Sequence, residues 1–174
     1  AEAIKRVEAF IQGGAQELQG RHINRVEGEI NSIHRLQDDK WIDQVLHSEE
    51  MLAFARQFLD DDAEPRKCEL FAKPALVGLP SPAHQDNFLF CIVGGNAITV
   101  WVALDPAGDD NGALYYYDGH HSEIIHGSEA NTSPQSRRGW TLQYKGRSSQ
   151  YDEARIAQYE ADLAEQLVAR GQAE

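Results

Sequence analysis

Two histidines and one carboxylate are the residues of this chain whose types could do chemistry. The carboxylate and one histidine share the tripeptide His84-Gln85-Asp86, and the second histidine is His126. Imidazole nitrogen and carboxylate oxygen together suit Fe(II), Mn(II), Co(II) or Zn(II), and this ligand set is typical of mononuclear non-haem iron(II) oxygenases. Three protein ligands leave metal positions open for a co-substrate and O2, whereas a closed structural site needs a fourth ligand. The sequence therefore favours an enzyme.

The spacing of His84 and Asp86 indicates that both side chains can reach one ion. Successive side chains on a β-strand point to opposite faces, so residues two apart emerge on the same face. We expect His84 and Asp86 to lie on one strand over residues 83–93. Tripeptides of this type also arise by chance in surface loops, so the assignment depends on what surrounds it.

Apolar periodicity and turn residues predict the elements that position these ligands. Helices are expected at 4–14, at 41–46, from a Ser48 cap to 59, and at 150–170, the last with an apolar stripe that packs outside the barrel. Strands are expected at 67–77, 83–93, 97–104, 112–117, 122–127 and 137–145. Six short strands with Gly-, Pro- and Asn-rich turns predict a mainly β fold with flanking helices, a jelly roll. We expect one domain over 1–174, with a helical N-terminal region at 1–64, a jelly-roll core at 66–146 and the C-terminal helix.

Composition and charge narrow the class of protein. The chain has 174 residues, of which 41% are hydrophobic, as expected for one soluble globular domain without an apolar run long enough to span a membrane. Its 16 basic and 28 acidic residues give a net charge of −12, which disfavours binding to nucleic acid. Cys68 and Cys91 lack metal-binding or disulfide spacing, so we expect buried free thiols and a cytoplasmic location. Composition carries no prediction of oligomeric state.

Several stretches recur in an order that is more specific than any one of them. They are Lys73-Pro74, His84-Gln85-Asp86-Asn87, the apolar strand from Ala97 to Asp105, Asn111-Gly112-Ala113-Leu114, and the segment from His126 to Ser133 that leads into Arg137-Arg138. In content and order they resemble the phytanoyl-CoA dioxygenase family, a branch of the Fe(II)/2-oxoglutarate-dependent oxygenases. That resemblance implies a double-stranded β-helix, the cupin-like form of the jelly roll.

Carried over position by position, the resemblance assigns a role to each candidate residue. The triad of His84, Asp86 and His126 matches the iron ligands, and Arg137 matches the arginine that holds the distal carboxylate of 2-oxoglutarate. Adjacent strand residues face opposite ways, so either Arg137 or its neighbour Arg138 enters the barrel, and we expect Arg137. Further co-substrate contacts are implied for Ser128, Lys73 and Trp101. The plain alternatives are a core aromatic for Trp101 and a solvated surface lysine for Lys73.

The implied activity is hydroxylation of a small-molecule metabolite, which uses Fe(II), 2-oxoglutarate and O2 and releases succinate and CO2. Related halogenases carry a small residue in place of the carboxylate, so Asp86 favours hydroxylation. A cupin-like metal-binding protein, or a hydrolase or isomerase, would use the same triad without 2-oxoglutarate and would not need Arg137. An acidic interaction module with a degenerate site is the third alternative. Phe88, Phe90 and Trp140 are expected to line the substrate pocket.

Two departures from the family pattern concern the length of the chain. The family begins with a strand before its first helix, so we expect that the start is trimmed. It also separates the H-x-D motif from the distal histidine by a longer segment, so we expect a missing stretch near Gly119-His120. If the chain is truly this short, His120 and His121 become rival metal ligands.

Overall fold

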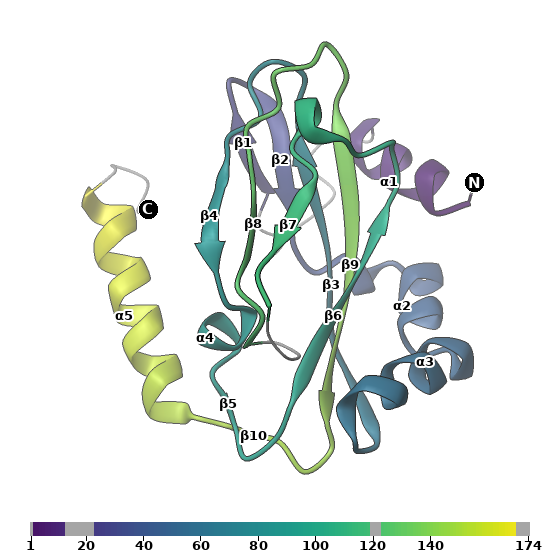
Figure 1. Cartoon of the computed structure of the whole chain (residues 1–174), viewed down its shortest axis with the longest axis vertical. Coiled ribbons are helices and arrows are strands. Elements are labelled where there is room, and N and C mark those ends of the chain that lie inside the picture. The colour runs from purple at the N-terminus through teal and green to yellow at the C-terminus, as the bar shows by residue number, and fades with distance from the viewer. Residues whose placement is uncertain (1, 13–22, 119–122, 170–174) are drawn as a thin grey trace.

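The computed structural model describes residues 2–12, 23–118 and 123–169 (Figure 1). Its helices and 3-10 turns are α1 (Glu2–Gln12), η2 (Leu36–Asp38), α2 (Lys40–Leu46), α3 (Glu49–Leu59), α4 (Asp86–Phe90), η3 (Asp109–Asn111) and α5 (Glu153–Ala169). Its strands are β1 (Ile23–Val26), β2 (Glu29–Ile33), β3 (Ala63–Lys73), β4 (Ser81–His84), β5 (Ile92–Val93), β6 (Ala97–Ala103), β7 (Leu114–Tyr116), β8 (His126–Ser128), β9 (Arg137–Gly146) and β10 (Gln150–Tyr151).

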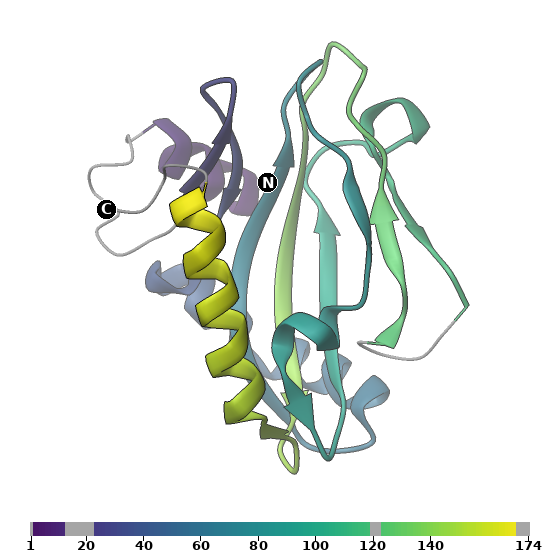
Figure 2. The same cartoon turned by 90° about the vertical axis from the view of Figure 1, so that its left-hand side faces the viewer.

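Two antiparallel sheets form the body of the barrel. The large sheet has the order β1-β2-β3-β9-β6, and the small sheet has the order β4-β8-β7. Figures 1 and 2 show the small sheet as a second layer beside the large one, with α1, α2 and α3 on the other side of the large sheet. A short ribbon of β5 and β10 leads into α5. The predicted mainly β, jelly-roll class is confirmed.

The main hydrophobic core lies between the helices and the outer face of the large sheet. Side chains alternate along β3 and β9, so Leu70, Trp140 and Leu142 join this core while their neighbours face the barrel interior. Trp140 stacks on Trp41 of α2 with ring centroids 6.4 Å apart. Trp140 therefore belongs to the core, and the expectation that it lines the substrate pocket is wrong.

Helix α3 begins where the sequence predicts, because Ser48 accepts a hydrogen bond from the backbone N–H of Met51. The N-terminal region at 1–64, which was expected to be helical, also holds two strands, since β1 and β2 form a hairpin that extends the large sheet. The positive φ angles of Glu27 and Gly28 allow the tight turn that joins β1 to β2. The polar residues of this stretch hide the strand signal.

The strand predicted over 83–93 is also wrong. Its first residues belong to β4, which ends at His84, and Asp86 begins the short helix α4. Phe88 and Phe90 therefore do not share a strand face: Phe88 is 68% exposed, whereas Phe90 is buried and lines the cavity described below.

Helix α5 lies on the side of the molecule opposite to α1, α2 and α3 (Figures 1 and 2), where its Arg155 contacts Phe88 of α4. In the first part of its predicted apolar stripe, Ala154 and Tyr159 are exposed and Ile156 is half-buried, so these residues pack less closely than expected. Among the described helices, none combines the length and apolar composition needed to cross a bilayer.

Candidate metal centre

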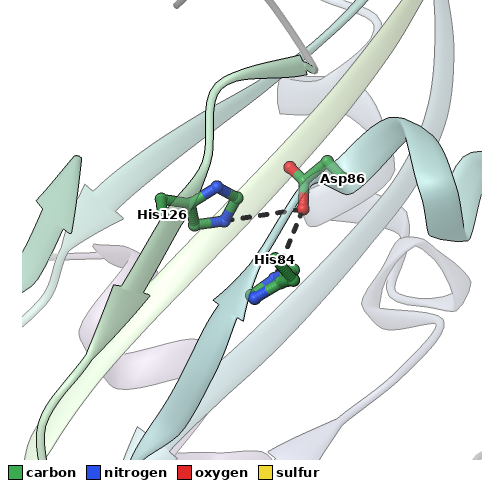
Figure 3. Close-up of side chains that lie close together, drawn as sticks. All are labelled: His84, Asp86 and His126. Carbon is green, nitrogen blue, oxygen red and sulfur yellow. Dashed lines mark ion pairs between the residues drawn. The ribbon is translucent and has the colours of Figure 1, made fainter. Parts of the chain in front are cut away.

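Three side chains from two separate stretches of the sequence converge at one end of the small sheet. The Oδ1 atom of Asp86 lies 3.8 Å from Nε2 of His84 and 3.6 Å from Nε2 of His126 (Figure 3). One potential ligand atom from each residue lies within 4.8 Å of the other two, and none of the three is fully exposed. Among the described residues, this is the group of histidine, cysteine and acidic side chains that is arranged to hold a metal ion.

Strand pairing brings the two histidines together. His84 ends β4 and pairs with His126 at the start of β8, so their rings lie 4.4 Å apart between centroids. Asp86 reaches the same point from the first position of α4, directly after Gln85, whose backbone is still extended. The side chains meet as the sequence predicts, but Asp86 lies at the start of a helix and not on the same strand as His84.

Each candidate ligand is held by a second group. Nδ1 of His84 lies 2.8 Å from the carbonyl of Pro82, and Nδ1 of His126 lies 3.1 Å from the carbonyl of Ile124. A carbonyl only accepts, so each Nδ1 carries a proton, and in the neutral imidazole this leaves the lone pair on Nε2. The hydroxyl of Thr99 donates to Oδ2 of Asp86 at 2.6 Å. Such outer partners orient metal ligands and fix the tautomer of a histidine.

A buried guanidinium lies beyond the triad in the same cavity. Arg137, on β9, is 3% exposed and donates from Nη2 to the carbonyl of Gly112 at 2.7 Å. Its guanidinium lies 5.4 Å from the ring centroid of Trp101. Burial lowers the pKa of Arg137. Its Nε is buried and has no hydrogen-bond partner among the described residues, so one buried donor is left unsatisfied.

Lys73 is the second buried cation of this region. It pairs with Arg137 across β3 and β9, is 4% exposed and donates from Nζ to the carbonyl of Leu79. Burial, followed by the positive charge of Arg137, lowers the pKa of Lys73 to about 8. Asn131 fixes the backbone here, because its amide donates to the carbonyl of Lys73 at 2.9 Å. The alternative of a solvated surface lysine is excluded.

All seven candidate residues line one cavity of about 810 Å³ inside the barrel. Ser128, on β8, is 2% exposed and lies on this wall, and Trp101 lines it from β6. Arg138 points away from the cavity, where its guanidinium donates to both carboxylate oxygens of Asp105 and contacts Glu8. The structure therefore places Arg137 inside and Arg138 outside.

Sequence analysis missed the polar groups on the inner wall. Glu69 of β3 accepts from the amide of Gln143 at 2.9 Å and lies 2.6 Å from Nδ1 of His34. Burial raises the pKa of Glu69, but the hydrogen bond and charge of His34 outweigh it, and the net pKa is lowered. Thr99 was also missed, although it lies two residues before Trp101 and so shares its strand face. His120 and His121, the rival ligands, lie outside the described residues.

The residues present fit a divalent metal and an anionic co-substrate. Two imidazole nitrogens and one carboxylate oxygen are suitable donors for Fe(II), and the triad supplies too few ligands for a closed site. Arg137, whose Nε is unpartnered, and Lys73 line the same cavity, where two neighbouring basic side chains suit a carboxylate.

Comparison with known proteins agrees with this arrangement. The sequence model of the phytanoyl-CoA dioxygenase family matches residues 1–123. The chain belongs to that family. The match includes His84 and Asp86, whereas His126 and Arg137 lie beyond it.

The relatives of this phytanoyl-CoA dioxygenase family member differ from it in length. Phytanoyl-CoA dioxygenase domain-containing protein 1 from Bos taurus is 28% identical over 120 residues, which are 67% of this chain and 41% of the bovine protein. The chain thus spans about two fifths of the length of the curated relatives it matches.

Solved structures show the same fold at low sequence identity. AviO1 from Streptomyces viridochromogenes Tue57 has a TM-score of 0.65 and 20% identity, over 86% of each chain. SnoN from nogalamycin biosynthesis, described as a non-heme alpha ketoglutarate dependent epimerase, has a TM-score of 0.62 and 15% identity over 84% of this chain and 76% of SnoN.

Proposed function

We propose that this protein is an Fe(II)- and 2-oxoglutarate-dependent oxygenase that hydroxylates a small molecule. The convergence of His84, Asp86 and His126 beside the buried Arg137 supports the proposal most strongly. The family membership and the similarity to SnoN, which is named as alpha ketoglutarate dependent, point the same way. The carboxylate at position 86 favours hydroxylation over halogenation.

Each residue has a specific task in this proposal. The triad holds the iron through two Nε2 atoms and Oδ1 of Asp86. Arg137 and Lys73 bind the distal carboxylate of 2-oxoglutarate, with Ser128 as a further donor, and Trp101 packs beside the guanidinium. The apolar side of the cavity wall, including Phe90 and Leu89, excludes water around the substrate.

Bound iron and 2-oxoglutarate supply the oxidising chemistry, with O2 as co-substrate and succinate and CO2 as products. The chain contributes positioning, so no side-chain general base is required. A cupin-like metal protein or hydrolase with the same triad would have no use for Arg137. The requirement for 2-oxoglutarate therefore separates the two candidate functions.

Succinate formation in the absence of substrate tests the proposal. Purified protein would receive Fe(II) and 2-oxoglutarate without oxygen, and then O2. We expect Asp86→Ala to abolish succinate formation, and Arg137→Ala to raise the 2-oxoglutarate requirement about 10- to 100-fold, because a hydrogen bond to a charged group contributes about 1.5–3 kcal/mol. Arg138→Gln, on the outer face, is the matched control and should leave that requirement unchanged. Equal succinate from the wild type and Asp86→Ala would overturn the proposal.

A further inference from the structure

The two carboxylate oxygens of Asp86 have different surroundings. Oδ1 faces the Nε2 atoms of both histidines, whereas Oδ2 accepts a 2.6 Å hydrogen bond from the hydroxyl of Thr99. That distance is typical of a strong hydrogen bond from a hydroxyl to a carboxylate. Rotation of the carboxylate would break this bond, so the hydroxyl favours the orientation in which Oδ1 faces the space between the imidazoles.

Thr99 is itself held in place by the large sheet. It lies in the middle of β6, opposite Gln143 of β9. Gln143 is buried, donates to Glu69 and accepts from Arg66 at 2.9 Å. These two hydrogen bonds hold the side chain opposite Thr99 in place. A β-branched side chain also has few χ1 rotamers on a strand. The hydroxyl is therefore a rigid donor rather than a mobile surface group.

Asp86 differs from the two histidines in the kind of partner that holds it. Backbone carbonyls hold both imidazoles, so no substitution removes those partners. The partner of Asp86 is one side-chain hydroxyl from another sheet. One substitution at position 99 therefore removes the orienting contact and leaves all three ligands in place.

We propose that Thr99 is a positioning residue that orients Asp86 to bind the metal through Oδ1. This inference rests on the proposed function, because it assumes that the triad holds a metal. With Oδ2 engaged by Thr99, the carboxylate offers one oxygen, which leaves the remaining positions of the metal to the co-substrate and O2.

The affinity for Mn(II), measured by titration calorimetry without oxygen chemistry, tests this inference. Thr99→Val keeps the shape of the side chain and removes the donor, and loss of an outer partner typically weakens metal binding about 10- to 100-fold. We expect a loss of that size. Thr99→Ser retains a hydroxyl and should recover most of the affinity, which a purely steric role of threonine would not explain.

Thr141→Val is the matched control. Thr141 also lies on the inner wall, on β9, but its hydroxyl donates to the backbone carbonyl of Glu69 at 3.2 Å. The Mn(II) affinity of the Thr141→Val variant should equal that of the wild type. Should Thr99→Val prove unfolded by circular dichroism, Thr99→Ala gives the same comparison with Thr99→Ser.

The outcomes separate this inference from the proposed function. Wild-type protein that binds Mn(II) together with a Thr99→Val variant of equal affinity would overturn the role of Thr99 alone. A wild type that binds no Mn(II) would overturn the proposed function and this inference with it. Equal losses in Thr99→Val and Thr141→Val would show a general effect of removing a hydroxyl, and would also overturn the inference.

Discussion

Lys73 is a cation whose charge depends on where the barrel places it. Its ammonium group is buried beside Arg137, and burial is the larger cause of its lowered pKa of about 8. Below that pH the site presents two positive charges. Above it, Lys73 becomes neutral, while Arg137 stays protonated throughout the accessible range.

The affinity for 2-oxoglutarate should therefore fall as the pH rises through about 8. We expect the Mn(II)-loaded protein to bind 2-oxoglutarate about tenfold more weakly at pH 9 than at pH 7, because one unit above its pKa about one tenth of a lysine remains cationic. Lys73→Met should bind weakly at both values. Calorimetric titration at the two values measures this, and a wild-type pH profile that matches Lys73→Met would exclude the contact.

Gly139 lies on β9 at a position where a larger residue does not fit, beside the indole of Trp101. A Cβ at Gly139 would overlap the indole of Trp101, which lies diagonally across from it on β6. The missing side chain thus makes room for the ring that packs beside Arg137.

Gly139→Ala should force Trp101 out of its position. We expect a loss of about 1–3 kcal/mol in the free energy of unfolding, as is typical of overpacking, measured by urea denaturation. The double variant Gly139→Ala with Trp101→Leu should lose less than the sum of the two single changes, because the smaller side chain removes the overlap. Strictly additive losses would contradict this account of Gly139.

Regular elements could be predicted from sequence more closely than irregular ones. Residues 137–145 and 97–104 were predicted as strands, and β9 and β6 differ from these ranges by one residue each. Apolar and polar residues alternate along β9, and β6 is a run of β-branched and other apolar residues. The run from Phe88 to Phe90 is too short for periodicity to distinguish a strand from a helix, and it lies in α4.

Some residues of the candidate site could likewise be predicted from sequence, and others could not. His84, Asp86, His126 and Arg137 carry rare combinations of type and spacing, so their pattern could be recognised. Thr99 could not be assigned a partner from sequence, because its contact depends on how β6 lies against the start of α4. Such long-range contacts are set by the packing of the two sheets.

A metal at the triad would connect the two sheets of the molecule. His84 and His126 belong to the small sheet, whereas Asp86 is joined to the large sheet through Thr99. A ligand that binds only the folded protein stabilises it by mass action. Metal binding is therefore expected to stabilise the whole barrel.

Mn(II) should raise the melting temperature of the wild type. At a metal concentration 100 times the dissociation constant, the stabilisation is about 2.7 kcal/mol. Asp86→Ala should show no such rise in thermal denaturation followed by circular dichroism. The same rise in the variant would locate the metal elsewhere, for example on the exposed acidic groups of a chain with a net charge of −12.

The face of β3 that lines the cavity carries a positive charge at Lys73 and a negative charge at Glu69. Lys73, Phe71 and Glu69 alternate along it, and the net lowering of the pKa of Glu69 keeps that group anionic near neutral pH. Four residues of a strand span about 13 Å, so an electric field runs along the chamber from the ammonium to the carboxylate. A dianion in the cavity is attracted toward the ammonium group of Lys73 and repelled by the carboxylate of Glu69, so the field draws it to the end that holds Arg137 before any close contact forms.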